Sequence, residues 1–142
     1  MQNTLVATSS IAIKAPVSKV WDALTNPEMI AKYLFGTKTV TDWNVGSPIT
    51  YTGVWEGKTY QDKGVVLANI PEKLLKTSYW SSMSGKPDKP ENYQIVTYTL
   101  TPNGGETTLT ITQEQITSEV DRDHSGDNWN MVLQTIKKLL ES

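Results

Sequence analysis

The stretch IAIKAPVSKVWDALTNPEMIAKYL, residues 11–34, decides the fold, because it places a strand directly before two short helices. After Pro16, apolar residues recur at i, i+3, i+4 and i+7, the spacing of one helix face: Val17, Val20, Trp21 and Leu24. Asn26-Pro27 ends this helix and begins a second one, since proline at the first helical position loses no hydrogen bond and Asn supplies a capping oxygen. We therefore predict one helix over residues 16–24 and another over residues 27–34.

The region after the helix pair predicts an antiparallel meander. Short segments of alternating apolar and polar residues are separated by turn sequences such as Glu56-Gly57-Lys58 and Asn103-Gly104-Gly105. Short connections of this kind join neighbouring antiparallel strands. Rows of threonine in the last hairpin indicate that one face of the sheet is solvated. Together with the segment before the first helix, the predicted strands are residues 4–14, 37–43, 48–55, 58–69, 73–81, 91–102 and 106–115.

A final amphipathic helix is predicted over residues 125–141. Its apolar stripe consists of Trp129, Val132, Leu133, Ile136, Leu139 and Leu140. A helix with one such stripe must cover an apolar surface, and the concave face of the sheet is the available one. The segment SSMSGKPDKPEN, residues 81–92, lies between two strands of the meander. We interpret it as a loop within one domain, of a length that tends to be functional or mobile.

Length and composition describe a single domain, residues 1–142, of modest charge. The 13 basic and 15 acidic residues are well mixed and give a net charge of −2, so no basic face indicates a nucleic-acid partner. The chain has no cysteine, which excludes disulfides, thiolate metal sites and a cysteine nucleophile. No stretch approaches the ~20 apolar residues of a membrane span, and the N-terminal segment lacks the features of a signal peptide. We expect a cytoplasmic protein with no membrane insertion.

No motif with a defined catalytic or metal-binding chemistry is complete. Residues 121–126, DRDHSG, match the first half of an EF-hand calcium loop, but Trp129 and Val132 occupy the positions of later ligands. An acidic helix entrance capped by Ser125 explains this segment better. His124 is the only histidine, and its polar neighbours predict a surface position near the start of the helix. The chain also lacks a G-x-S-x-G serine motif. We predict no metal, no cofactor and no catalytic residue.

The aromatic residues suggest a cavity. Five Trp and six Tyr accompany a single Phe. A buried indole N–H or phenol O–H needs a hydrogen-bond partner, so a closed core has little use for so many polar-tipped rings. The wall of a partly wet ligand cavity suits them better. The alternative is that these rings are half-exposed strand residues, which β-propensity alone favours.

The order of strand, helix pair, six-strand meander and long C-terminal helix resembles the START/SRPBCC helix-grip superfamily. Within it, the chain is similar to bacterial relatives of the activator of heat-shock protein 90 ATPase. This resemblance implies an α+β fold: a seven-stranded antiparallel curved sheet around the C-terminal helix, two short helices after the first strand, and an internal cavity with those helices at its mouth. It covers essentially the whole chain and is carried by Ala15-Pro16, Val20-Trp21, Ala23-Leu24-Thr25, Pro27, Trp55, Tyr60, Asp62-Lys63-Gly64, Val65-Val66-Leu67, Pro71, Leu74-Leu75, Trp80, Ser84-Gly85, Pro90-Glu91-Asn92-Tyr93, Val96-Thr97-Tyr98-Thr99-Leu100, Thr108-Leu109, Asn128-Trp129 and Leu139-Leu140.

Members of this superfamily bind lipids, sterols, polyketides or plant hormones, and some are cyclases or dehydratases. The resemblance therefore implies a binding protein for a small hydrophobic molecule, lipid-like or aromatic and polyketide-like. The ligand would lie between the sheet and the C-terminal helix. For each candidate ligand-binding residue, plain core packing is the alternative; the candidates are Tyr51, Trp55, Tyr60, Trp80, Tyr98, Trp129 and Leu133.

Two other classes of function compete with this one. A chaperone-associated or stress-related interaction module, or one that self-associates, would have a filled core and an exposed apolar patch, with residues 81–92 or 27–34 as the contact surface. A cyclase-, dehydratase- or hydrolase-type enzyme would need a carboxylate or histidine inside the cavity, and Glu56 or Asp62 would be the candidates. Eukaryotic activators carry a separate N-terminal chaperone-binding domain that we do not find in this sequence, which weighs against chaperone activation.

Overall fold

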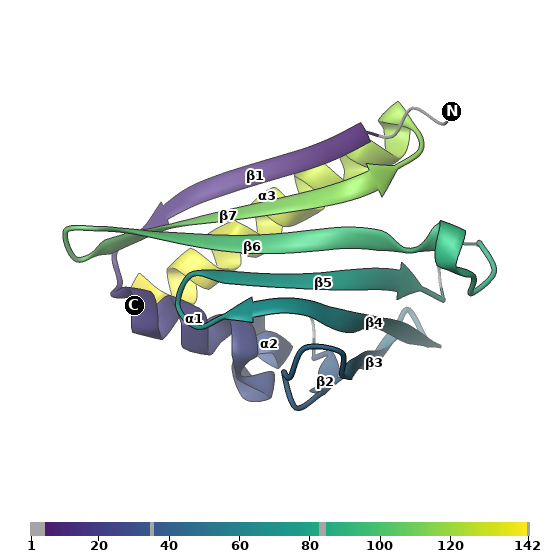
Figure 1. The fold of residues 1–142 in the computed structure, drawn as a ribbon, viewed down its shortest axis with the longest axis horizontal. Helices are drawn as coiled ribbons and strands as arrows, with labels where there is room; N and C mark the ends of the chain where they lie inside the picture. The colour runs from purple at the N-terminus through teal and green to yellow at the C-terminus, as the bar shows by residue number, and fades with distance from the viewer. Residues whose placement is uncertain (1–4, 35, 83–84, 142) are drawn as a thin grey trace.

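The computed structural model describes residues 5–34, 36–82 and 85–141, and it shows a seven-stranded antiparallel sheet with three helices (Figure 1). The strands follow the order β1-β7-β6-β5-β4-β3-β2. Their bounds are β1 (Leu5–Ile13), β2 (Lys38–Val40), β3 (Pro48–Trp55), β4 (Lys58–Ile70), β5 (Leu74–Ser81), β6 (Gln94–Asn103) and β7 (Glu106–Ile116), and the helices are α1 (Val17–Thr25), α2 (Pro27–Tyr33) and α3 (Glu119–Glu141). The predicted helix-grip α+β fold is therefore confirmed.

The helix pair forms as the sequence predicts. Pro16 is the N-cap of α1, and the helix buries Val20, Ala23 and Leu24. Asn26 ends α1 and caps α2, because its Oδ1 accepts a hydrogen bond of 3.0 Å from the backbone N–H of Glu28. The two helices pack against each other and against α3.

The C-terminal helix is longer than predicted. It begins at Glu119, and Ser118 rather than Ser125 caps it: Ser118 Oγ accepts a hydrogen bond of 3.1 Å from the N–H of Asp121. The acidic first turn, Glu119 and Asp121, interacts favourably with the helix dipole. The partial EF-hand match therefore lies inside a helix and does not form a loop.

Two other segments differ from the predicted bounds. The strand expected over residues 37–43 is reduced to β2, because Asp42 Oδ1 accepts a hydrogen bond of 2.9 Å from the N–H of Asn44 and Trp43 adopts a positive φ of 66°. In the long loop, Pro90–Asn92 form a 3₁₀ turn, and the Tyr93 hydroxyl donates to Asp88. Residues 83–84 of this loop lie outside the described residues.

The core is divided between two clusters. The larger one joins β1, β6, β7 and the helices, with Ile13, Ile111 and Leu133 among its fully buried members. The smaller one consists of one residue each from β3, β4 and β5: Ile49, Val66 and Leu75. Because α3 packs mainly against β1 and β7, as Figure 1 shows, it leaves part of the inner face of β3–β5 without a helix against it.

Strands β4 and β5 approach each other closely at Gly64, next to an irregularity in their pairing. Their register shifts between Val66 and Ala68, and Ser78 Oγ accepts a hydrogen bond of 2.9 Å from the N–H of Val65. A Cβ atom on the neighbouring Gly64 would lie 1.8 Å from the carbonyl oxygen of Ser78. This close approach brings β4 and β5 together beside the cavity described below. None of the helices in the described part of the chain has the length and hydrophobicity that a membrane crossing requires.

Candidate functional site

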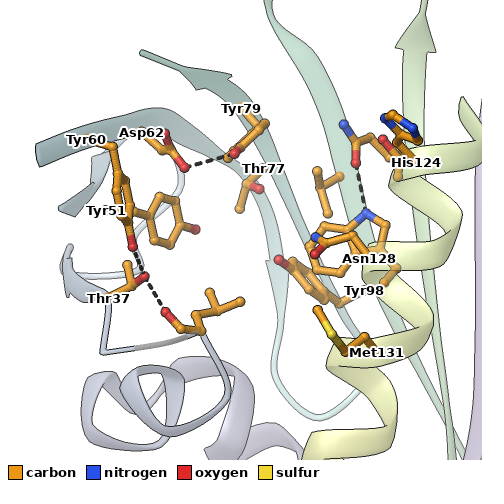
Figure 2. A pocket seen from close by; sticks show the side chains of 15 residues that line it. Thr37, Tyr51, Tyr60, Asp62, Thr77, Tyr79, Tyr98, His124, Asn128 and Met131 are labelled. Atoms are coloured by element: carbon orange, nitrogen blue, oxygen red, sulfur yellow. Dashed lines mark hydrogen bonds between the residues drawn. The ribbon is translucent and has the colours of Figure 1, made fainter. Parts of the chain in front are cut away.

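A cavity of about 540 Å³ lies between the inner face of the sheet and α3 (Figure 2). Its wall is formed by residues of five strands (β3–β7), of the segment after α2, and of α3 between His124 and Met131. The lining residues are Leu34, Thr37, Tyr51, Tyr60, Asp62, Thr77, Tyr79, Val96, Tyr98, Gln113, His124, Ser125, Asn128, Trp129 and Met131. The cavity therefore extends over the part of the inner sheet face that α3 does not pack against, with α3 as its opposite wall.

Three tyrosines from adjacent strands and one carboxylate form the sheet side of the cavity. Tyr51, Tyr79 and Tyr98 come from β3, β5 and β6, and Asp62 comes from β4 between them. The Tyr79 hydroxyl donates a hydrogen bond of 2.9 Å to Asp62 Oδ2. Burial raises the pKa of all three tyrosines well above the ordinary range, and the charge of Asp62 raises the pKa of Tyr51 and Tyr79 further. The phenols therefore remain neutral hydrogen-bond donors at physiological pH.

Three polar groups on this wall have no hydrogen-bond partner among the described residues. The hydroxyls of Tyr51 and Tyr98 make no hydrogen bond within the part of the chain that the structure describes. Asp62 Oδ1 is buried and likewise unpaired among the described residues. Buried polar groups in folded proteins are normally paired, so an unpaired set around a cavity indicates that a ligand or water completes it.

The rim next to α2 is held by hydrogen bonds. The Tyr60 hydroxyl bonds to Thr37 Oγ1, and Thr37 in turn donates to the carbonyl of Leu34 at the end of α2. The ring of Tyr60 lies over Gly53, where a Cβ atom would be 2.5 Å from the Tyr60 oxygen. This chain of contacts connects β4 to the helix pair and positions Tyr60 at the cavity edge (Figure 2).

The α3 side of the cavity combines one anchored ring with exposed polar residues. Trp129 donates from Nε1 to Gln113 Oε1 at 2.8 Å, and its ring meets Tyr98 edge to face, with centroids 6.0 Å apart and planes at 89°. His124, Asn128 and Met131 line the cavity and are also solvent-exposed. Residues that face both the cavity and solvent mark its opening, so the mouth lies along the N-terminal half of α3.

The structure brings together four of the seven residues predicted to bind ligand. Tyr51, Tyr60, Tyr98 and Trp129 line the cavity, and their contact with a ligand stays a prediction. Leu133 is only 1% exposed and belongs to the main core. The side chain of Trp55 lies outside the described part of the structure.

Trp80 lies on the outer face of the sheet instead of in the cavity. It follows Tyr79, which points inward, and successive side chains of a strand point to opposite faces. Its ring stacks on Tyr93 with centroids 6.5 Å apart, Lys63 Nζ lies 5.7 Å from its centroid, and its Nε1 donates to the Lys86 carbonyl at 3.2 Å. Trp80 therefore anchors the loop before β6.

The remaining lining residues were not predicted as ligand contacts. Asp62 was named only as an enzymatic candidate; it lines the cavity, whereas Glu56 lies exposed in the hairpin turn between β3 and β4. His124 is exposed as predicted, but it also lines the cavity. The signal that could have placed the α3 residues in the wall is the capping sequence that begins at Ser118, since it extends the helix back past them.

Comparison with solved structures gives the same fold. The solution structure of ChR145 from Cytophaga hutchinsonii is 45% identical, with a TM-score of 0.86, and the match covers 99% of this chain and 97% of that one. The Aha1 dimer from Colwellia psychrerythraea is 21% identical (TM-score 0.76; 96% of each chain covered). DynU16, a protein in the dynemicin biosynthetic locus, is 19% identical, with a TM-score of 0.78, and the match covers 96% of this chain and 47% of that one.

No curated protein matches the chain. A family model, described as Activator of Hsp90 ATPase homolog 1-like protein, matches residues 14–141. This match spans the helix pair, the strands that build the cavity wall and the C-terminal helix. The chain therefore belongs to the family of Activator of Hsp90 ATPase homolog 1-like proteins.

Proposed function

We propose that this protein binds a small, largely hydrophobic molecule, lipid-like or aromatic, in the cavity between the sheet and α3. The observation that carries the proposal is the cavity itself: about 540 Å³ of space walled by aromatic rings and hydroxyls, of which those of Tyr51 and Tyr98 have no partner among the described residues. Small-molecule sites typically have volumes of about 300–1,000 Å³ and combine apolar walls with a few polar groups that orient the ligand.

The polar groups support ligand binding over plain core packing. In a filled core, the hydroxyls of Tyr51 and Tyr98 would have to find protein partners, and within the described chain they have none. Both can donate to a ligand oxygen, since their raised pKa values keep them protonated. Trp129 and Tyr98 offer ring surfaces for an apolar or aromatic body.

The first experiment is a binding screen with flavonoids, fatty acids, sterols and aromatic metabolites. Trp129 lines the cavity, so a bound compound should change the intrinsic tryptophan fluorescence, and it should also raise the melting temperature. If no class of compound changes either signal, the proposal fails.

A matched pair of variants on α3 tests the location. Asn128 and Asn130 are both exposed, but only Asn128 lines the cavity. We expect Asn128→Phe to block the mouth and weaken binding of any compound found in the screen, and Asn130→Phe to leave binding unchanged. Equal binding by the two variants would place the ligand elsewhere.

An enzymatic use of the same cavity is the second candidate, because Asp62 and His124 both line it. This candidate is tested by mass spectrometry of a bound compound before and after prolonged incubation; a product that disappears with Asp62→Asn would support it. The interaction-module hypothesis expects a filled core, and the cavity weighs against it. Self-association stays a prediction, to be measured by light scattering.

A further inference from the structure

The cavity wall contains an aspartate that no Lys or Arg of the described residues pairs with. Asp62 is the one acidic residue among the described lining residues, and none of these is Lys or Arg. The next residue, Lys63, lies on the other face of β4, where it pairs with Asp88 and contacts the Trp80 ring. Asp62 has no ion pair within the described part of the chain.

The surroundings of Asp62 are better suited to a cation than to an anion. One of its oxygens accepts from Tyr79, and the other, Oδ1, is buried without a partner among the described residues. The faces of aromatic rings carry partial negative charge and attract cations, and Tyr51, Tyr98 and Trp129 supply such rings around the same space. A ligand carboxylate would be repelled by Asp62 and would find no Lys or Arg among the described wall residues; the one basic side chain there, His124, lies at the exposed mouth on α3.

We propose that the preferred ligand is a hydrophobic amine, protonated at neutral pH, whose nitrogen is held on the Asp62 side of the cavity and whose apolar body lies among the aromatic rings. This inference rests on the proposed ligand-binding function and narrows it. Among lipid-like and aromatic compounds, amines are favoured, neutral alcohols are intermediate and carboxylates such as fatty acids are rejected.

The test uses three probes that share one apolar body: naphthylethylamine, naphthylethanol and naphthylacetate. The neutral dye Nile red is included to report on cavity binding without charge. Dissociation constants are measured at pH 7 by tryptophan fluorescence and calorimetry. Because charge-assisted hydrogen bonds are roughly twice as strong as neutral ones, we expect the amine to bind about tenfold or more tightly than the alcohol, and the carboxylate to bind most weakly.

Two aspartate variants form a matched pair. Asp62→Asn removes the charge inside the cavity and keeps an oxygen that can accept from Tyr79. Asp88→Asn removes the same charge from the outer face, where Asp88 also accepts from a tyrosine hydroxyl, that of Tyr93. We expect Asp62→Asn to abolish the preference for the amine and Asp88→Asn to retain it. Circular dichroism and thermal unfolding check that both variants fold.

The outcomes separate this inference from the proposed function. If the amine and the alcohol bind equally, or if Asp62→Asn retains the preference, the inference is overturned and ligand binding stands. If Nile red binds and none of the three naphthyl probes does, the inference is likewise overturned and ligand binding stands. If neither Nile red nor any naphthyl probe binds but a compound of the broader screen does, the inference is overturned and ligand binding stands. If no compound of either set binds, both the inference and the proposed function are overturned.

Discussion

Four tyrosines, Tyr33 in the core and three half-buried ones at the cavity, predict a loss of stability in alkali. In the folded protein, burial raises the pKa of Tyr33, Tyr51, Tyr79 and Tyr98 well above the ordinary value of about 10. Unfolding exposes them and returns their pKa to that value. The folded state thus holds protons that the unfolded chain releases once the pH exceeds about 10, so stability is unaffected below this pH and falls above it.

The magnitude follows from proton linkage. A tyrosine that stays protonated when folded and ionises with a pKa of about 10 when unfolded lowers the free energy of unfolding by about 1.4 kcal/mol at pH 11. Four such residues together lower it by at most about 6 kcal/mol, against about 5–15 kcal/mol for the total stability of a typical domain. At pH 8 the ionisation of these tyrosines changes the free energy of unfolding by almost nothing.

Urea unfolding followed by far-ultraviolet circular dichroism at pH 8, 9, 10 and 11 measures this loss. Tyr98→Phe provides the internal test, because its hydroxyl has no hydrogen-bond partner in the described chain. At pH 8 this variant should match the wild type within about 1 kcal/mol, the net worth of a typical hydrogen bond. At pH 11 it should gain about 1.4 kcal/mol relative to the wild type, since one titrating group is gone. A parallel decline of the two proteins with pH would refute the reasoning.

Three further predictions concern individual positions. Gly64→Ala should lower the free energy of unfolding by about 3 kcal/mol or more, or prevent folding, because its Cβ would overlap the Ser78 carbonyl. Gly126→Ala has open space around it in α3, so it should raise the free energy of unfolding by about 0.5–1 kcal/mol. Urea unfolding measures both. Leu133→Ala should lower the free energy of unfolding by about 2–5 kcal/mol and leave ligand affinity unchanged in the fluorescence assay. A loss of ligand affinity in this variant would show that Leu133 contacts the ligand. Trp80→Ala should speed proteolysis of the loop before β6 without changing ligand affinity, and a weaker complex would contradict its outer-face position.

Most of the fold was predictable because its signals are local. The spacing of apolar residues after Pro16, the Asn26-Pro27 boundary and the glycine turns each specify an element within a few residues of chain. The start of α3 was missed because its first half carries few apolar residues and the prediction followed the apolar stripe. Ser118 was the available signal, and its capping role depends on the helix that follows it.

The candidate site was harder to predict, because side-chain direction depends on strand register. Tyr79 and Trp80 are adjacent and equally aromatic, yet only Tyr79 faces the cavity. The register shift between Val66 and Ala68 also changes which residues of β4 face inward, and no local pattern reveals it. Leu133 and Trp129 belong to the same apolar stripe, and only the path of α3 over β1 and β7 separates core from cavity wall.

The division of α3 has a consequence for engineering this scaffold. His124, Asn128 and Met131 recur at i, i+4 and i+7 and touch the cavity from an exposed helix face, while the buried residues Val132 and Ile136 hold the helix in the core. The positions that line the cavity and the positions that hold α3 in the core are therefore separate on one helix. A library that randomises only the three exposed positions should yield folded proteins with altered ligand choice, without compensating changes in the sheet.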